Sequence, residues 1–206
     1  MSTPPLEVII LAAGKGTRMR SALPKVLHEL AGKPLLQHVL DTSRQLGAER
    51  LHVVYGFGGD QLRNAITGDD LNWILQAEQK GTGHAVQLAL ECVDEASTAM
   101  VLYGDVPLVS PHSLQAMLDA AGHDAVGLMT AMLDDPAAYG RIIRDENNRF
   151  KEIVEFSDAT DVQRAVQEIN TGFLAAPAKR LKKWLSGINS DNAQGEFYLT
   201  DIFALA

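Results

Sequence analysis

The sequence predicts an α/β fold in which a mostly parallel central sheet is flanked by helices and carries an inserted β-hairpin. Residues 7–12 form a continuous apolar run between turn residues, which is typical of a strand covered on both faces in a parallel sheet. Further along, short apolar segments alternate with segments whose apolar residues recur at helical spacing. The alternation breaks near residue 139, where two short segments flank a polar turn.

Each element after the first strand follows from local signals. The first helix is expected at 34–46, because its apolar residues share one stripe and Gly47 follows its end. Ser110 and Pro111 supply the cap and first residue of another helix that ends near Gly122. The remaining strands are predicted at 51–55, 72–75, 98–103, 125–132 and 169–176, and the remaining helices at 60–66, 84–93, 159–165, 178–185 and 196–205.

The inserted hairpin is expected from residues 139–144 and 149–154, which flank the turn sequence Asp-Glu-Asn-Asn. We interpret residues 139–156 as a flap on the substrate side of the molecule. No internal repeat, low-complexity tract or long linker interrupts the chain, so residues 1–206 are interpreted as one domain.

Composition excludes several classes of protein. The net charge of −8 argues against general nucleic-acid binding. The single cysteine, Cys92, has no partner for an internal disulfide, which favours a reducing compartment, and we expect the cytoplasm. The first apolar run is too short for a membrane helix and lacks the features of a signal peptide, so no membrane association is expected. The histidines lack the spacing of a metal site.

A glycine-rich basic loop follows the first strand and gives the clearest functional signal. Between Val8 and His28 there is no acidic residue and there are four basic ones: Lys15, Arg18, Arg20 and Lys25. This local positive charge contrasts with the net charge of −8 of the whole chain. Gly14 and Gly16 allow main-chain N–H groups to approach phosphate oxygens, so the loop predicts a polyphosphate site. The sequence matches neither a Walker A loop nor the dinucleotide fingerprint. The alternative is a solvated basic loop, which the glycines disfavour.

Three more segments lie where strands end, at the edge where parallel sheets bind ligands. Gln76–Ala85 offers amides and glycines that suit the edge of a pyrimidine base, with a polar connection as the alternative. Asp105 follows a buried strand and is a candidate Mg²⁺ ligand, with a turn cap as the alternative. Residues 139–140, Glu155 and 170–172 offer hydrogen bonds to a sugar, although polar strand ends are often without function.

Together these motifs resemble one family. They are Leu11–Met19 with Pro24-Lys25, Gln76–Ala85, Tyr103–Leu108, Tyr139–Arg141, Ile169–Gly172 and Gln194–Asp201. The chain is similar over nearly its whole length to the N-terminal uridyltransferase domain of the bacterial bifunctional UDP-N-acetylglucosamine pyrophosphorylase/glucosamine-1-phosphate N-acetyltransferases. The resemblance implies a Rossmann-like, GT-A-like nucleotidyltransferase fold.

The resemblance also implies an activity: Mg²⁺-dependent transfer of UMP from UTP to N-acetylglucosamine 1-phosphate, giving UDP-N-acetylglucosamine for peptidoglycan and lipopolysaccharide precursors. It implies catalytic roles for Arg18, Lys25 and Asp105, with Asp105 as the metal ligand. The substrate contacts that it implies are Leu11, Ala12, Ala13, Gly14, Lys25, Gln76, Gly81, Thr82, Tyr103, Gly104, Asp105, Gly140, Glu155, Asn170 and Thr200. Attack by a phosphate oxygen needs no general base, because the nucleophile is already an anion.

The resemblance also implies that parts of the family's protein lie outside this sequence. These are the remainder of the uridyltransferase domain, with an Asn that supplies a second metal ligand, and the β-helix acetyltransferase domain that forms the trimer. We therefore expect a C-terminally incomplete domain with weak turnover. Phe156-Ser157 departs from the more polar pair of some relatives. Two alternatives stay open: a nucleotidyltransferase that uses dTTP or CTP with another sugar phosphate or a small alcohol phosphate, and a non-catalytic nucleotide-sensing or assembly module.

Overall fold

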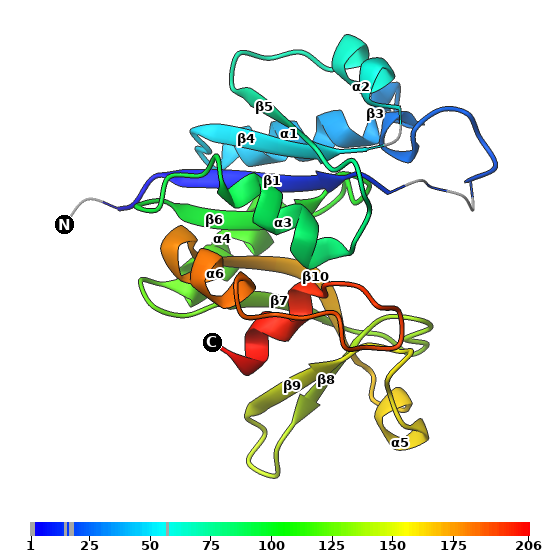
Figure 1. The fold of residues 1–206 in the computed structure, drawn as a ribbon, viewed down its shortest axis with the longest axis vertical. Coiled ribbons are helices and arrows are strands. Elements are labelled where there is room, and N and C mark those ends of the chain that lie inside the picture. The colour runs from blue at the N-terminus through cyan, green and yellow to red at the C-terminus, as the bar shows by residue number, and fades with distance from the viewer. Residues whose placement is uncertain (1–2, 15, 17–18, 57) are drawn as a thin grey trace.

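The structure, a computed structural model, describes residues 3–14, 16, 19–56 and 58–206. Within these residues one eight-stranded sheet forms the centre of the molecule, and a two-stranded ribbon of β2 (Glu29–Leu30) and β3 (Lys33–Pro34) lies apart from it. The sheet follows the order β5-β4-β1-β6-β10-β8-β9, and β7 pairs with β10 (Figure 1). None of the described helices has the length and hydrophobicity needed to cross a membrane.

The first half of the sheet is parallel and carries the predicted βαβ plan. Its strands are β5 (Leu71–Leu75), β4 (Arg50–Tyr55), β1 (Leu6–Ala12) and β6 (Thr98–Tyr103). All seven residues of β1 are buried, as expected for a strand covered on both faces. The α/β fold predicted from the sequence is therefore confirmed.

Successive residues of β1 face two separate cores, because side chains alternate along a strand. Val8 and Ile10 pack with residues of α1 (Leu35–Gln45), α2 (Gly59–Ala65) and α4 (Pro111–Ala121). Ile9 and Leu11 pack with residues of α3 (Thr82–Leu90), α6 (Ala178–Leu185) and the 3-10 helix η3 (Leu199–Ala204). Helices therefore cover both faces of the sheet and fix the carboxyl ends of its strands.

The second half of the sheet is antiparallel. The long strand β10 (Glu168–Pro177) pairs antiparallel with β6, with β7 (Gly127–Met132) and with β8 (Arg141–Arg144), and β8 pairs with β9 (Phe150–Val154). The β8–β9 hairpin lies at the far end of the sheet from β5 (Figure 1). The direction of β10 corrects one expectation, because Asn170 lies near the start of its strand rather than at its carboxyl end.

Three helices have a boundary that differs from the sequence prediction by two residues or more. The helix expected at 84–93 begins at Thr82, directly after Gly81, whose φ is +105°. The helix expected at 159–165 is the single turn α5 (Asp161–Arg164), which Thr160 caps. The helix expected at 196–205 is η3, which starts only at Leu199. Residues 196–198 stay extended because Phe197 exchanges main-chain hydrogen bonds with Lys80 and Gly83, at 2.8 Å each.

Candidate active site

Two adjoining cavities lie along the edge where the parallel strands end. The loop cavity, of about 240 Å³, is lined by Leu11, Ala12, Ala13, Gly14, Lys25, Val26, Gln76, Gln79, Gly81, Thr82, Ala85, Tyr103, Asp105 and Glu196. The flap cavity, of about 300 Å³, is lined by Thr82, Tyr103, Leu128, Ala138, Glu155, Phe156, Ser157, Asn170, Gly172, Leu174, Gln194, Glu196, Tyr198, Leu199, Thr200 and Phe203. Thr82, Tyr103 and Glu196 line both cavities.

An ion pair occupies the loop cavity. The ammonium group of Lys25, on the short 3-10 helix η2 (Lys25–Leu27), pairs with the carboxylate of Asp105, which follows β6. Both side chains retain solvent exposure, at 41% for Lys25 and 22% for Asp105. Opposite charges are therefore already balanced at this place in the free protein.

The glycine loop packs directly against this ion pair. Gly16 has a φ of +57°, and a Cβ there would lie 2.9 Å from the Cβ of Lys25, so only glycine fits. A Cβ on Gly14 would meet open space, which leaves its main chain accessible from the cavity. Arg18, the third residue with a predicted catalytic role, lies outside the described residues, as do Lys15 and Thr17.

Gln76 provides a fixed amide in the loop cavity. Its side chain is buried, with 4% exposed, and its Nε2 donates to the Gly81 carbonyl at 3.1 Å and lies 3.2 Å from the Nδ1 of His84. The absence of a side chain at Gly81 serves the fold, since a Cβ there would lie 2.5 Å from the Phe197 carbonyl oxygen. From the sequence, the expected role of Gly81 was instead to let main-chain groups approach a base closely.

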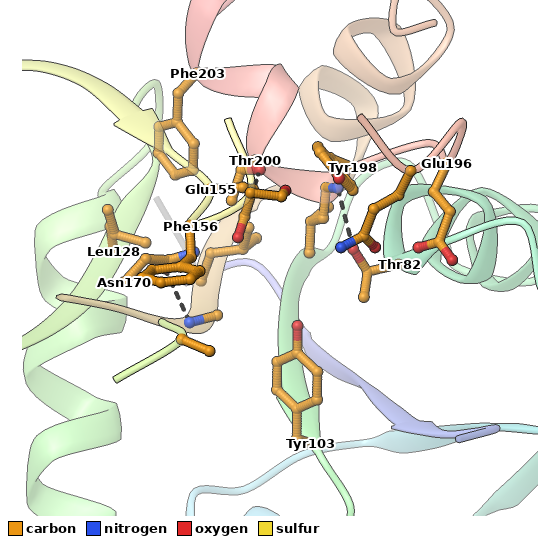
Figure 2. A pocket seen from close by; sticks show the side chains of 16 residues that line it. Thr82, Tyr103, Leu128, Glu155, Phe156, Asn170, Glu196, Tyr198, Thr200 and Phe203 are labelled. Carbon is orange, nitrogen blue, oxygen red and sulfur yellow. Dashed lines mark hydrogen bonds between the residues drawn. The ribbon is translucent and has the colours of Figure 1, made fainter. Parts of the chain in front are cut away.

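Glu155 and Thr200 form the polar centre of the flap cavity. The Thr200 hydroxyl donates to Glu155 Oε1 at 3.0 Å, and Figure 2 shows both side chains pointing into the cavity. Burial raises the pKa of Glu155, and the nearby carboxylates of Asp158 and Asp201 raise it further, although the Thr200 hydrogen bond acts in the opposite direction. Asp201 itself has a raised pKa because of burial and the charge of Asp158.

Tyr103 forms the wall between the two cavities. Burial raises its pKa to about 12, and the charges of Glu155 and Asp105 contribute. The phenol is therefore a neutral hydrogen-bond donor across the physiological range of pH. Gly172 makes room for this ring, because a Cβ there would lie 2.5 Å from Tyr103 Cε2.

Two glycines with predicted contacts line neither cavity among the described residues. Gly104 is buried, its N–H donates to the Leu11 carbonyl at 3.0 Å, and a Cβ there would lie 3.2 Å from Leu36. Gly140 lies behind the flap cavity. Its carbonyl accepts from the Asn170 N–H at 2.9 Å, and a Cβ there would lie 3.1 Å from Glu155 Oε2. Gly140 therefore acts on the cavity through Asn170 and Glu155.

Several lining residues had no role in the sequence interpretation. The side-chain amide N–H of Gln79 donates to the Ala13 carbonyl and so connects the segment Gln76–Ala85 to the glycine loop. Phe156, Glu196 and Tyr198 line the flap cavity. The motif Gln194–Asp201 contributed to the resemblance, yet only Thr200 within it was given a role. The extended path of residues 196–198, which brings Glu196 and Tyr198 to the cavity, depends on tertiary hydrogen bonds of Phe197 and is not visible in the local sequence pattern.

The chemistry of the loop cavity suits one metal-binding carboxylate. Among the residues that the structure describes, no three His, Cys, Asp or Glu side chains gather as a metal cage. Asp105 places a hard oxygen ligand in the same cavity as Lys25 and the main chain of the glycine loop. Mg²⁺ is commonly held by one or two carboxylates together with substrate phosphates and water, and this donor set fits such an arrangement.

The sequence and fold agree with a known family. Residues 8–170 match the model of the MobA-like NTP transferase domain. The chain belongs to this family. It is a nucleotidyltransferase domain, and the α/β nucleotidyltransferase fold expected from its motifs is confirmed.

Individual relatives give the same result. Over 201 residues the chain is 55% identical to the bifunctional protein GlmU of Paraburkholderia phymatum, an alignment that covers 98% of this chain and 44% of that protein. The chain thus spans less than half the length of this relative, and the resemblance to the bifunctional family is confirmed.

Solved structures support the fold alone, since their identities are low. A UDP-glucose pyrophosphorylase complexed with UDP-glucose superposes with a TM-score of 0.78 at 18% identity, covering 97% of this chain and 85% of that one. A putative glucose-1-phosphate thymidylyltransferase from Bacillus anthracis superposes with a TM-score of 0.75 at 20% identity, covering 97% and 82%.

Proposed function

We propose that this chain transfers UMP from UTP to N-acetylglucosamine 1-phosphate and releases pyrophosphate. The observation that carries the proposal is the pair of adjoining cavities, one with features for phosphates and a base and the other with features for a neutral sugar. Because Thr82, Tyr103 and Glu196 line both cavities, substrates in the two places would meet at a common wall. The resemblance of the motifs to the bifunctional uridyltransferase family favours UTP and the acetylated amino sugar.

Charge balance in the loop cavity supports the phosphate assignment. In the free protein the ammonium of Lys25 neutralises Asp105. Triphosphate oxygens would compete for Lys25, and Asp105 would then be free to bind a divalent cation. A bound Mg²⁺ would offset charge on the phosphate oxygens during the transfer. Lys25 and the main chain at Gly14 would orient the triphosphate for attack at its α-phosphorus.

The flap cavity supports a neutral, hydroxyl-rich acceptor. Glu155 accepts a hydrogen bond from Thr200 and retains Oε2 for a second one. Asn170 presents an amide that is anchored by the Gly172 N–H, which donates to its Oδ1 at 2.9 Å. Tyr103 remains protonated and donates. None of these groups needs to remove a proton, since the attacking phosphate oxygen is already an anion.

We assign Gln76 to recognition of the uracil edge. Its amide orientation is set by the Gly81 carbonyl, which leaves Oε1 to accept a hydrogen bond from the base. Main-chain groups at Ala13 and Gly14 line the same cavity and provide further partners. We place the reaction in the cytoplasm, because the exposed thiol of Cys92 is compatible with a reducing compartment.

A matrix of substrates tests the proposal. Pyrophosphate release would be measured with UTP, dTTP, CTP and GTP, each with N-acetylglucosamine 1-phosphate and with glucose 1-phosphate, in the presence of Mg²⁺. We expect the highest kcat/KM for UTP with the acetylated sugar. A preference for dTTP, CTP or another sugar phosphate would contradict the substrate assignment. Nucleotide binding without pyrophosphate release from any pair would instead support a sensing module.

One pair of variants tests the base assignment. Gln76→Met removes the acceptor Oε1 while keeping a similar side-chain shape, and it should lower the preference for UTP over CTP by about tenfold, the effect of one hydrogen bond to the base edge. Gln87→Met is the matched control, because Gln87 lies on α3 and its amide donates to the Leu185 carbonyl at 2.6 Å, away from both cavities. An unchanged preference in Gln76→Met would remove Gln76 from base recognition.

A further inference from the structure

Arg141 is a buried arginine behind the flap cavity, and nothing in the proposed reaction assigns it a role. It opens β8 and has only 2% of its surface exposed, which places it among the largest fully buried side chains. A buried charge is costly unless it is paired or fully hydrogen-bonded. Among the described residues no carboxylate lies within ion-pair distance of Arg141, so its stabilisation comes from other groups.

Carbonyl groups from two segments accept hydrogen bonds from its guanidinium. Nη2 donates to the Ala137 carbonyl at 3.0 Å and Nη1 donates to the Tyr139 carbonyl, whereas Nε donates to the carbonyl of Arg164 at 3.2 Å. The guanidinium carbon also lies 5.7 Å from the ring centroid of Phe156. A planar fork with several fixed donors suits this arrangement, and a lysine ammonium cannot reproduce it.

The loop whose carbonyls accept from Arg141 also forms part of the flap cavity. Ala138, between the two accepting carbonyls of the loop, lines the cavity. Ala137 has a φ of +42°, which is unfavourable for a residue with a side chain and needs support from its surroundings. The next glycine, Gly140, accepts from the Asn170 N–H, so the position of the loop is passed on to Asn170.

Phe156 carries the second connection. Arg164 lies 4.7 Å from the same ring, and its Nε donates to the Phe156 carbonyl at 3.3 Å. Phe156 follows Glu155 in the chain, and Figure 2 shows Phe156 and Asn170 together on one side of the cavity, across from Thr82. Two guanidinium groups thus hold the ring that forms this side of the cavity.

We propose that Arg141 is a positioning residue that fixes the wall of the flap cavity and thereby sets its affinity and selectivity for the sugar phosphate. This inference rests on the proposed function for the identity of the ligand. Arg141 contacts no substrate in this account. It acts through the loop that carries Ala138 and through Phe156, and none of the described residues that line the loop cavity is hydrogen-bonded to it.

The test measures KM for both substrates in the Arg141→Lys variant. This variant keeps the positive charge and removes the planar guanidinium group. We expect KM for N-acetylglucosamine 1-phosphate to rise by about tenfold to a hundredfold, the effect of a wall displaced by a fraction of an ångström to 1 Å. KM for UTP should stay within about twofold, because the residues that accept hydrogen bonds from Arg141 do not line the loop cavity. Selectivity against glucose 1-phosphate should fall in parallel.

Arg144→Gln is the matched control. Arg144 lies on the same strand and is bonded to Glu168 by two contacts of 2.7 Å, and it lines neither cavity. Its loss should leave both KM values unchanged.

Arg164→Leu keeps the proposal testable if Arg141→Lys fails to fold. Arg164 is partly exposed and lines neither cavity, so its replacement removes one cation from Phe156 without altering the cavity lining. We expect about a threefold rise in KM for the sugar phosphate, the effect of one exposed cation–π contact.

The outcomes separate this inference from the proposed function. If the unmodified protein releases no pyrophosphate with N-acetylglucosamine 1-phosphate, the proposed function fails. Hydrogen exchange at residues 137–140 then tests Arg141, with faster exchange in Arg141→Lys as the supporting result and unchanged exchange as the contradicting one. If the unmodified protein is active, an unchanged sugar KM in Arg141→Lys, or an equal rise of KM for UTP, overturns the positioning role. If Arg141→Lys does not fold, an unchanged sugar KM in Arg164→Leu overturns it.

Discussion

The loop cavity and the flap cavity adjoin, yet they are built in different ways. The loop cavity combines the main chain of parallel strand ends with the ion pair between Lys25 and Asp105. The flap cavity consists largely of side chains from the antiparallel half of the sheet and from η3. Charged phosphates can be recognised by main-chain donors and cations, whereas a neutral sugar needs individually placed hydrogen-bonding side chains. The comparison predicts that substitutions in the two cavities affect different substrates.

The largest effect is expected from Asp105→Asn in the loop cavity. The variant keeps the side-chain volume and removes the charge that would hold Mg²⁺, so we expect pyrophosphate release to fall on the order of 10³-fold. Steady-state rates measured over a range of Mg²⁺ concentrations provide the test. Asp41→Asn serves as the control, because Asp41 forms a comparable ion pair with Lys33 at 2.7 Å, outside both cavities. Retained metal stimulation in Asp105→Asn would exclude Asp105 as the metal ligand.

Lys25→Met should produce a smaller loss together with a gain in metal affinity. We expect kcat/KM to fall by about 10²-fold, because one preorganised cation is lost. Without nucleotide the same variant should bind Mn²⁺ more tightly than the unmodified protein, since Lys25 no longer neutralises Asp105. Titration calorimetry with Mn²⁺ alone measures this second effect, with Lys33→Met as the control. Equal or weaker metal binding in Lys25→Met would refute the competition between lysine and metal.

Gly172→Ala acts on the wall that the cavities share. Its φ is +82°, and the added Cβ would lie 2.5 Å from the ring of Tyr103, so both backbone strain and displacement of the ring are expected. We expect a loss of about 2 kcal/mol in the free energy of unfolding and higher KM values for both substrates. Gly195→Ala, with a φ of +65° and no neighbour within 4 Å, should cost about 1 kcal/mol and leave both KM values unchanged. Urea unfolding with parallel kinetics would reveal whether the two variants differ.

The smallest effect concerns the pH dependence of stability in the flap cavity. Burial raises the pKa of Glu155 in the folded protein, so the folded state holds its proton more tightly than the unfolded state does. The stability linked to this group is present below the ordinary pKa of a glutamic acid and is lost as the pH rises through the folded value. Glu155→Gln should therefore flatten the decline of unfolding free energy in that window.

Glu168→Gln provides a comparison of opposite sign. Arg144 lowers the pKa of Glu168 by hydrogen bonding, against an opposing effect of burial. The stability linked to Glu168 is thus present above the ordinary carboxyl pKa and is lost on acidification. Denaturant titrations of both variants from a pH below the ordinary carboxyl pKa up to neutral pH would show the two effects. Parallel profiles for Glu155→Gln and Glu168→Gln would mean that the flap carboxyl is not buried as described.

The sequence predicted the elements whose signals are local. The strand Thr98–Tyr103 and the helix Ala178–Leu185 have the predicted boundaries, because an apolar run and a helical stripe each fix their own element. The Ser110 cap is present, with its hydroxyl accepting from the Ser113 N–H at 3.0 Å. Lys25 and Asp105, far apart in the sequence, lie together in the loop cavity, as a site at the ends of parallel strands requires.

Features set by distant contacts were not predictable from local patterns. The apolar run of β10 does not encode its direction, and only its pairing with β6 makes it antiparallel. Residues 196–198 stay extended because Lys80 and Gly83 take up the main-chain groups of Phe197. Arginines are seldom buried, so local patterns did not predict that Arg141 lies inside the molecule.

The most direct measurement of the central claim is a crystal structure with UDP-N-acetylglucosamine and Mg²⁺. We predict the uracil beside Gln76, the diphosphate next to Lys25 and Asp105, and the sugar between Glu155 and Asn170, with Tyr103 at the junction. A nucleotide bound outside the loop cavity, or a sugar that leaves the flap cavity empty, would contradict it.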